Sequence, residues 1–312
     1  MAGITHSAFR RLLADFGGYG ALFTEMLCGR WLLREPLEAS PAVKRRPQEG
    51  TVFYQLMIGD PGIVSAVMDR LLEIRPAGVD LNCACPAPNV RAVGAGSELF
   101  EDPPRMEAIL EAMRRKYPGP LTVKLRLGRP ADDWRQRLSE RLRLIAGCGA
   151  DAVIVHPRFA NEKLKRRARH ELFPELCAAA GLPLVASGDI HRPAVVHEHP
   201  DHFRGVAAIM VGRMAVVQPW AFAAWHGPVS GINLLEVWQR FVTYVLEDFP
   251  PPKALYRVKA FTRYFARNFR FGHTLDAIAQ GARDLAMLRR RAEDFLARNA
   301  EQTTQAHVEG LA

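Results

Sequence analysis

Short apolar runs recur along the first two thirds of the 312-residue chain, each separated from the next by a stretch long enough for a helix. Seven such runs stand at residues 21–26, 51–57, 78–84, 121–127, 151–157, 182–188 and 206–212. Several are apolar at consecutive positions, as in strands covered on both faces. Between them, residues 103–116 open with prolines and end in basic residues, and residues 134–145 repeat apolar residues at helical spacing. The alternation predicts βα units around a parallel sheet.

Seven strands do not complete a (β/α)8 barrel, and the sequence opens with a loop and a helix, MAGITHSAFRRLL. We therefore predict an α/β fold, a (β/α)8 TIM barrel whose first strand is truncated. A natural start upstream of Met1 is the favoured explanation, because an open barrel would expose two unpaired strand edges.

Beyond Gly231 the pattern is helical only, and we expect helices at 234–248, 253–268 and 275–300. The predicted organisation is a barrel domain at 1–229, an all-helical C-terminal domain at 230–300 and a polar tail at 301–312.

The charge balance favours a polyanionic partner. The chain has 42 Lys and Arg against 33 Asp and Glu, a formal net charge of +9. Five cysteines are too few, and odd in number, for a disulfide framework, which indicates a reducing compartment. The sequence has no signal peptide and no apolar stretch that would span a bilayer, so we expect a cytoplasmic protein with no membrane partner.

Polar residues stand where the predicted strands end, which is where a barrel of this kind places its chemistry. Two late strands end in SGDI (187–190) and VGRMA (211–215). Main-chain N–H groups at Gly188 and Gly212, with Arg213 as a charged donor, are suited to a phosphate. The alternative is that both glycines only permit tight turns. The other polar strand-end residues include Gln55, Asn82, Lys124, Arg126, His156 and Arg158.

Lys124 is a charged residue within the otherwise apolar run LTVKLRL. A buried ammonium needs an anion or an acceptor. A flavin offers acceptors at N1 and the C2 oxygen, with Gln55 on the pyrimidine edge, whereas an ion pair with Glu25 or Asp80 is the alternative. Neither a G-x-G-x-x-G nor a P-loop motif is present, so FMN fits the phosphate loops better than FAD.

Cys83 and Cys85 end another strand, and no second Cys or His cluster stands at a spacing that would complete a metal site, so we expect no metal. A structural role is the default for Cys28, Cys148 and Cys177. Cys85 precedes a proline-rich loop at the same end of the sheet. As a neutral thiol it would give a proton to one face of a substrate whose other face receives hydride.

Two basic segments favour a polyanion over a small neutral substrate. Lys259, Arg263 and Arg267 are spaced by four residues and share a helix face. The segment 163–170, with Lys165 and Arg167, follows the strand that ends at His156. The alternative is that both are solvated faces, the second paired with Glu171 and Glu175.

The motifs resemble the tRNA-dihydrouridine synthase family of FMN-dependent TIM-barrel enzymes. The resemblance runs in order through MAGIT, TEM, YQLMIGDP, DLNCACP followed by GAGSELFEDP, VKLRLG, VHPR, SGDI and VGRMA. Three departures are Ala84 where the family usually has Gly, Ser187 where it has Asn, and the absence of a Pro before Met1 and of the whole first strand.

The resemblance implies a general acid at Cys85 and uracil contact by Asn82, and we place Arg158 with the substrate as well. It implies FMN contacts by Met1, Ala2, Gln55, Lys124, Ser187, Gly188, Asp189, Gly212 and Arg213, with His156 beside the ring.

The implied reaction reduces FMN with NADPH or NADH, transfers hydride to C6 of a uridine and protonates C5 from Cys85. The implied partner is tRNA, with ribosomal RNA left open, and we expect a monomer. Two alternatives stay open: an FMN-dependent barrel oxidoreductase of a small pyrimidine or enone, and a flavin-free RNA-binding relative.

Overall fold

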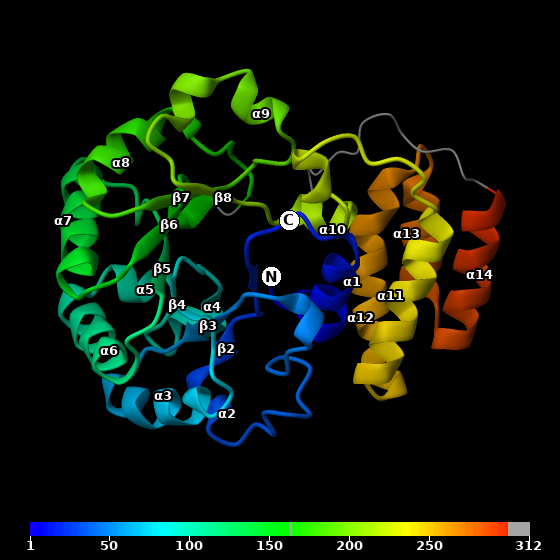
Figure 1. Ribbon diagram of the computed structural model, residues 1–312, viewed down its shortest axis with the longest axis horizontal. Coiled ribbons are helices and arrows are strands. Elements are labelled where there is room, and N and C mark those ends of the chain that lie inside the picture. The colour runs from blue at the N-terminus through cyan, green and yellow to red at the C-terminus, as the bar shows by residue number, and fades with distance from the viewer. Residues whose placement is uncertain (163, 299–312) are drawn as a thin grey trace. The chain divides into compact units, whose positions relative to one another are not determined.

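The computed structural model describes residues 1–162 and 164–298, which form two units (Figure 1). Residues 26–37 and 51–211 form one unit, here called the barrel unit. Residues 1–25, 38–50 and those from Gly212 to the end of the described chain form the other, here called the helical unit. The helical unit thus includes N-terminal residues that the sequence places with the barrel. The predicted tail at 301–312 lies outside the described residues.

The barrel unit contains a parallel sheet in which each strand pairs with the next along the chain. Its strands are β2 (Leu27–Cys28), β3 (Val52–Met57), β4 (Gly78–Cys83), β5 (Leu121–Arg126), β6 (Ala152–His156), β7 (Leu184–Ser187) and β8 (Ala208–Met210). From β3 onward each strand lies within a predicted apolar run.

The strand predicted at 21–26 is too long. Only Leu22–Phe23 of this run forms a strand, β1, which belongs to the helical unit, and β2 begins at Leu27, directly after the run. The polar pair Thr24–Glu25 interrupts it, because the Glu25 carboxylate turns to the Gly3 amide at 2.8 Å and the Thr24 hydroxyl bonds the carbonyl of Glu25.

Helices follow the strands of the barrel unit, and α3, α6, α7 and α8 lie along the outside of the sheet (Figure 1). The helices are α2 (Gly29–Leu32), α3 (Val64–Leu72), α4 (Pro88–Arg91), α5 (Ser97–Phe100), α6 (Pro103–Lys116), α7 (Trp134–Gly147), α8 (Phe173–Ala180) and α9 (Ala194–His197). Helix α6 has its predicted bounds. The Asp102 side chain caps its first turn at the amide of Arg105, and its last turn is basic, which suits the helix dipole.

The two faces of β4 differ in chemistry although every residue of the strand is buried. The Cys83 sulfur lies 4.0 Å from that of Met106 on α6, so Cys83 faces the helices. Side chains alternate along a strand, so Asp80 and Asn82 point to the opposite face. The sheet therefore has an apolar helix-facing side and, on its other side, a row of polar groups.

The helical unit contains α1 (Ser7–Phe16), α10 (Arg213–Val217), α11 (Leu234–Asp248), α12 (Pro251–Phe265), α13 (Gly272–Gly281) and α14 (Leu285–Arg298). In the described residues no strand precedes α1. Helix α11 has its predicted bounds, and the predicted helix 253–268 is α12 with a 3-10 turn at 266–268. The parallel βα repeat and these C-terminal helices confirm the predicted fold class.

The single helix predicted at 275–300 is wrong, because two helices, α13 and α14, occupy its described part. The break follows Gly281, and the Asp284 carboxylate accepts the amide of Met287 at 2.7 Å, which begins a new helix. Residues 299 and 300 lie outside the described chain. Across residues 1–162 and 164–298, every helix is too short or too polar to cross a membrane.

A buried ion pair fixes the N-terminal part of the helical unit. The Arg10 guanidinium bonds the Glu49 carboxylate at 2.6 Å, and both side chains are within 1% of complete burial. Arg10 also donates to the carbonyls of Thr5 at 2.8 Å and Lys44 at 2.6 Å. The remaining Glu49 oxygen accepts the Arg46 amide at 2.8 Å. The bonds of Arg10 to Glu49 and to Lys44 join α1 to the segment 38–50, which is distant in the sequence.

His6 predicts a loss of stability in mild acid. Its ring is buried against Phe241 and Phe249, and among the described residues neither ring nitrogen has a hydrogen-bond partner. Burial, with the charges of Arg257, Arg10 and the N-terminus and against that of Asp248, holds the pKa of His6 well below its usual 6.5. The unfolded chain then takes up a proton below pH 6.5 that the folded chain does not.

We expect the free energy of unfolding to fall by about 1.4 kcal/mol more in the wild type than in His6→Leu between pH 7.5 and 5.5. Urea unfolding of both proteins at the two pH values measures this difference. Equal losses in the two proteins would contradict it.

Candidate active site

The strand register brings the polar residues of the barrel unit to one face of the sheet. Gln55 of β3 lies opposite Asp80 of β4, which lies opposite Thr122 of β5. One step closer to the strand ends, Asn82 lies opposite Lys124. Beyond these, Arg126 lies opposite His156 of β6. Residues predicted separately from their strand ends therefore form successive polar layers.

Asp80 lies at the bottom of these layers and is completely buried. One carboxylate oxygen accepts the amide of Gln55 at 2.7 Å, and the other accepts the hydroxyl of Thr122 at 2.6 Å. Burial raises the pKa of Asp80 to about 7, against the effect of these two hydrogen bonds and of the Lys124 charge. The carboxylate is thus held by neutral donors.

A chain of side-chain amides leads from Asp80 to the end of β4. The Asn82 amide donates to the Gln55 carbonyl oxygen at 2.9 Å. The Asn82 carbonyl oxygen accepts the backbone N–H groups of Ala84 at 3.1 Å and Cys85 at 3.0 Å. The loop that carries Cys85 is therefore bonded to side chains of the sheet.

Lys124 is half-buried, and within the described residues its amine has no hydrogen bond or ion pair. Burial lowers its pKa to about 8, while the charge of Asp80 opposes that shift. Asp80 takes its hydrogen bonds from Gln55 and Thr122, so the ion pair with Asp80 considered from the sequence does not form. The donors of the Lys124 amine are therefore not used by the described residues.

The two cysteines at the end of β4 differ in their surroundings. Cys83 is buried against α6, and burial with the nearby Asp80 charge raises the pKa of its thiol far above the usual range. Cys85 is half-buried, and its carbonyl accepts the amide of Ser97 at 2.9 Å. No group of three or more His, Cys, Asp or Glu side chains in the described part of the chain is placed to hold a metal ion.

His156, Arg158 and Asp189 form a second cluster, in which the histidine and the arginine are buried and the aspartate is half-buried. The Arg158 guanidinium bonds the Asp189 carboxylate and the carbonyl of Arg166, each at 2.5 Å, and lies 2.7 Å from the His156 Nε2 atom. Gly188 has φ +104°, and a Cβ atom there would come within 2.4 Å of the His156 ring. A glycine is therefore required between β7 and Asp189. All three donor nitrogens of Arg158 are used inside the protein.

The described part of the basic segment after β6, from residue 164, is a loop that runs to a 3-10 turn at His170–Leu172. Lys165, Arg166 and Arg167 are exposed, whereas Arg169 is bound by both oxygens of Glu162. Glu175, one of the two acids that the alternative interpretation pairs with this segment, forms an ion pair with Arg135. Lys163 lies outside the described residues.

The other predicted site residues belong to the helical unit. The Met1 amino group donates to the Thr5 hydroxyl at 2.7 Å, next to Ala2. Gly212 directly precedes α10, of which Arg213 is the first residue. In α12, Lys259 donates to the carbonyl of Gln280 at 3.0 Å and Arg263 lies 3.7 Å from Asp276. Arg267 is exposed. The structure thus brings together in the barrel unit Gln55, Asn82, Cys85, Lys124, His156, Arg158, Ser187, Gly188 and Asp189.

Sequence reasoning missed the buried hydrogen bonds that Asp80 forms with Gln55 and Thr122. The available signal was spacing: Asp80 stands two residues before Asn82, and Thr122 two before Lys124, so each pair shares a face of its strand.

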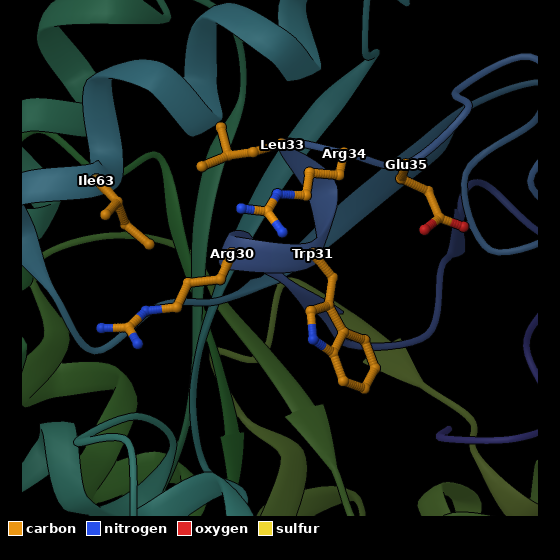
Figure 2. A pocket seen from close by; sticks show the side chains of 6 residues that line it. All are labelled: Arg30, Trp31, Leu33, Arg34, Glu35 and Ile63. Atoms are coloured by element: carbon orange, nitrogen blue, oxygen red, sulfur yellow. The ribbon is translucent and has the colours of Figure 1, made fainter.

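A surface hollow of about 580 Å³ lies outside this set of residues (Figure 2). It is lined by Arg30, Trp31, Leu33, Arg34, Glu35 and Ile63, and the Trp31 side chain is exposed. Arg30 lies 3.6 Å from the Asp60 carboxylate. Glu35 and Asp60 balance the two arginines, so charge alone does not select an anionic ligand here.

Comparison with known proteins gives one consistent result. Residues 1–302 match the family model described as dihydrouridine synthase. A tRNA-dihydrouridine synthase B of Shewanella oneidensis is 30% identical over 223 residues, covering 71% of this chain and 68% of the relative. The protein of the same name from Vibrio parahaemolyticus is 28% identical over 226 residues, covering 72% and 69%. That of Escherichia coli K12 is 27% identical over 308 residues, 95% of both chains.

Proposed function

We propose that this chain, because it belongs to the dihydrouridine synthase family, is an oxidoreductase that reduces uridines of tRNA to 5,6-dihydrouridine at the polar face of its parallel sheet. We also propose that it acts in the cytoplasm as a monomer. The observation that carries the site assignment is the register of β4 with β5. This register sets Lys124 of β5 opposite Asn82 of β4. Cys85 follows Asn82 by three residues, just after β4 ends.

Flavin mononucleotide, when bound in its reduced form, would supply the hydride for C6 of the uracil ring. NADPH or NADH would then return the oxidised flavin to the reduced form. The unpartnered amine of Lys124 fits this group, because a half-buried cation with a lowered pKa needs an acceptor and a flavin presents two. We assign Gln55 and His156 to the ring as well. In the barrel unit, the assigned cofactor contacts further include Ser187, Gly188 and Asp189. The contacts by Met1, Ala2, Gly212 and Arg213 stay predictions from the sequence, since these residues belong to the helical unit.

Cys85 holds a proton at Sγ and passes it to C5. The neutral thiol is the form that the reaction needs.

Asn82 has a restricted hydrogen-bonding capacity for the substrate. Two backbone amides already use the lone pairs of its side-chain oxygen, and Gln55 uses one of its two N–H groups. One N–H remains. Asn82 therefore fits a carbonyl oxygen of uracil rather than the N3–H group.

Arg158 has a second role beside the substrate contact predicted from the sequence. Its donors hold His156, Asp189 and the backbone of Arg166 at once. We propose that it positions His156 and, through the carbonyl of Arg166, the basic segment.

Lys165 and Arg167 offer exposed charges for the RNA backbone, and Arg267 does so on the helical unit. We include Lys259 and Arg263 among the RNA contacts, although each already has a partner in the protein. A base inside folded RNA must leave its stack to be reduced, which costs a few kcal/mol. Phosphate contacts supply the binding energy for that step.

Reversing the charge at Lys165 and Arg167 together should weaken tRNA binding and flatten its salt dependence. Each lost phosphate contact removes about 0.9 from the slope of log K against log salt concentration, so the double variant should lose between about 1 and 2. Fluorescence anisotropy with labelled tRNA across a salt titration measures this slope.

The matched control reverses Arg115 and Arg143. Both are exposed, and each lies near the end of a helix, α6 or α7, that leads into the opposite end of the sheet. The two double variants change the net charge equally. If Lys165 and Arg167 contact the RNA, only their variant should have a clearly smaller salt-dependence slope. Equal slopes in both would remove the loop from the RNA site.

Dihydrouridine mapping by mass spectrometry in total RNA, from cells with and without the gene, tests the proposed reaction. We expect dihydrouridine to disappear from particular tRNA positions in the cells that lack the gene, while ribosomal RNA stays unchanged. Flavin absorbance of the purified protein is the second measurement. A colourless protein together with an unchanged dihydrouridine map would instead favour the flavin-free RNA-binding alternative.

A further inference from the structure

Asp80 is a completely buried carboxylate to which none of the roles above is assigned. It lies one layer below Asn82 and Lys124 in the register of β4 and β5. An ionised carboxylate can only accept hydrogen bonds, and Asp80 accepts two. Every group bonded to it must therefore present a donor.

This requirement sets the direction of the amide chain. Gln55 must turn its NH₂ group to Asp80, which leaves its oxygen facing Asn82. Asn82 then turns its own NH₂ group to Gln55, which leaves its oxygen facing the backbone amides of Ala84 and Cys85. An amide side chain fits its site almost equally well when turned by half a rotation, so the two ends set the direction of the chain: the Asp80 acceptor at one end and the two backbone N–H donors at the other.

The reversed direction would release the Cys85 loop. If Gln55 turned its NH₂ group to Asn82, the side-chain oxygen of Asn82 would have to accept that hydrogen bond. Its NH₂ group would then meet two backbone N–H donors, and these donors would be left without an acceptor, which is unfavourable.

The far side of the Cys85 backbone is also tightly fitted. The Cys85 carbonyl accepts the Ser97 amide at 2.9 Å. Gly96 has φ +62°, and a Cβ atom there would come within 2.5 Å of that carbonyl oxygen. The backbone of Cys85 is thus held between Asn82 on one side and residues 96–97 on the other.

We propose that Asp80 is a positioning residue that acts through Gln55 and Asn82, so that its carboxylate fixes the backbone carrying Cys85 and turns Asn82 toward the substrate. The backbone part of this proposal stands on the hydrogen bonds alone. The substrate part rests on the proposed function.

Asp80→Asn is the direct test, because asparagine has the same shape but offers both a donor and an acceptor and so no longer selects the direction at its own end of the chain. Thr122→Val is the matched control. It removes one buried hydrogen bond to Asp80 but leaves the acceptor that faces Gln55. Both variants are compared with the wild type at pH 8, where more of the Asp80 carboxyl is ionised than at neutral pH.

The first measurement is hydrogen exchange at the amides of Ala84 and Cys85, followed by mass spectrometry or NMR. In Asp80→Asn we expect exchange to be about tenfold faster than in the wild type, and in Thr122→Val no more than about twofold faster. Amides of α6 around Ile109 serve as the internal reference, because a global loss of stability would speed both regions by the same factor. Equal factors at the loop and at α6, or equal effects of the two variants, would overturn the proposal.

Gln55→Met keeps the proposal testable if Asp80→Asn does not fold. It breaks the same chain one link further on and leaves Asp80 in place. We expect the same faster exchange at Ala84 and Cys85. Slow exchange in Gln55→Met would overturn the proposal.

The second measurement separates this inference from the proposed function. At saturating tRNA, Asp80→Asn should lower kcat for dihydrouridine formation about tenfold with KM changed by less than about twofold, because the acid is misplaced while the RNA contacts remain. A KM effect alone would overturn the positioning role. If the wild type forms no dihydrouridine, the proposed function fails, and hydrogen exchange still decides the backbone part.

Discussion

Cys85→Ala should retain flavin reduction by NADPH while forming dihydrouridine at least about a hundredfold more slowly, because a positioned general acid contributes roughly 10² to 10⁴ in rate. The two half-reactions need different groups: hydride transfer to the cofactor does not involve the thiol, whereas protonation at C5 does. Single-turnover assays with pre-reduced enzyme and tRNA isolate the second half-reaction, and stopped-flow absorbance isolates the first.

Cys177→Ala is the control for loss of a thiol. Cys177 is half-buried on α8, and it has no assigned part in the reaction. We expect this variant to match the wild type in both half-reactions. Full activity in Cys85→Ala would remove Cys85 from the reaction, and slow flavin reduction in it would show instead that the cysteine holds the cofactor.

Glu49→Gln should destabilise the helical unit by about 3–5 kcal/mol, because it leaves the completely buried guanidinium of Arg10 without its counter-charge. The hydrogen-bonding shape is nearly unchanged, so the loss reports mainly on the buried charge. Urea unfolding followed by circular dichroism measures it.

Two further variants separate charge from packing. Asp201→Asn breaks a 2.5 Å ion pair with Arg204 whose side chains are 80% and 77% exposed, and it should cost less than about 1 kcal/mol. Replacing Arg10 with Met and Glu49 with Leu together should recover part of the stability, because apolar groups leave no unpaired charge. If the free energy of unfolding fell by less than about 1 kcal/mol in Glu49→Gln, the Arg10–Glu49 ion pair would not be strongly coupled.

The strands from β3 to β8 were predictable because each is an apolar run between clear breaks. The errors arose where local pattern competes with distant contacts. Residues 21–26 read as one strand, but Glu25 bonds the amide of Gly3. Residues 275–300 read as one helix because apolar spacing continues across the gap, although Gly281 and Asp284 together end one helix and begin another.

The site was predictable to the extent that strand ends meet at one edge of a parallel sheet. That argument placed Asn82, Lys124 and Cys85 together without knowledge of the register. It did not identify the partners of Asp80, because the register between β3, β4 and β5 decides which side chains lie opposite each other. One sequence does not contain that register. The same register explains why Lys124 has no ion pair with Asp80 among the described residues: the Asp80 carboxylate accepts its hydrogen bonds from Gln55 and Thr122 instead.

The buried carboxylate of Asp248 has a consequence for protein engineering. It lies at the end of α11 and bonds Ser7, Lys44 and Arg46, while Tyr244 of the same helix bonds Asp15. A C-terminal fragment cut out at residue 230 would leave these groups facing water without their partners. Chimeras that exchange the helical part between homologues should therefore transplant segments 1–25 and 38–50 along with it, as a discontinuous cassette.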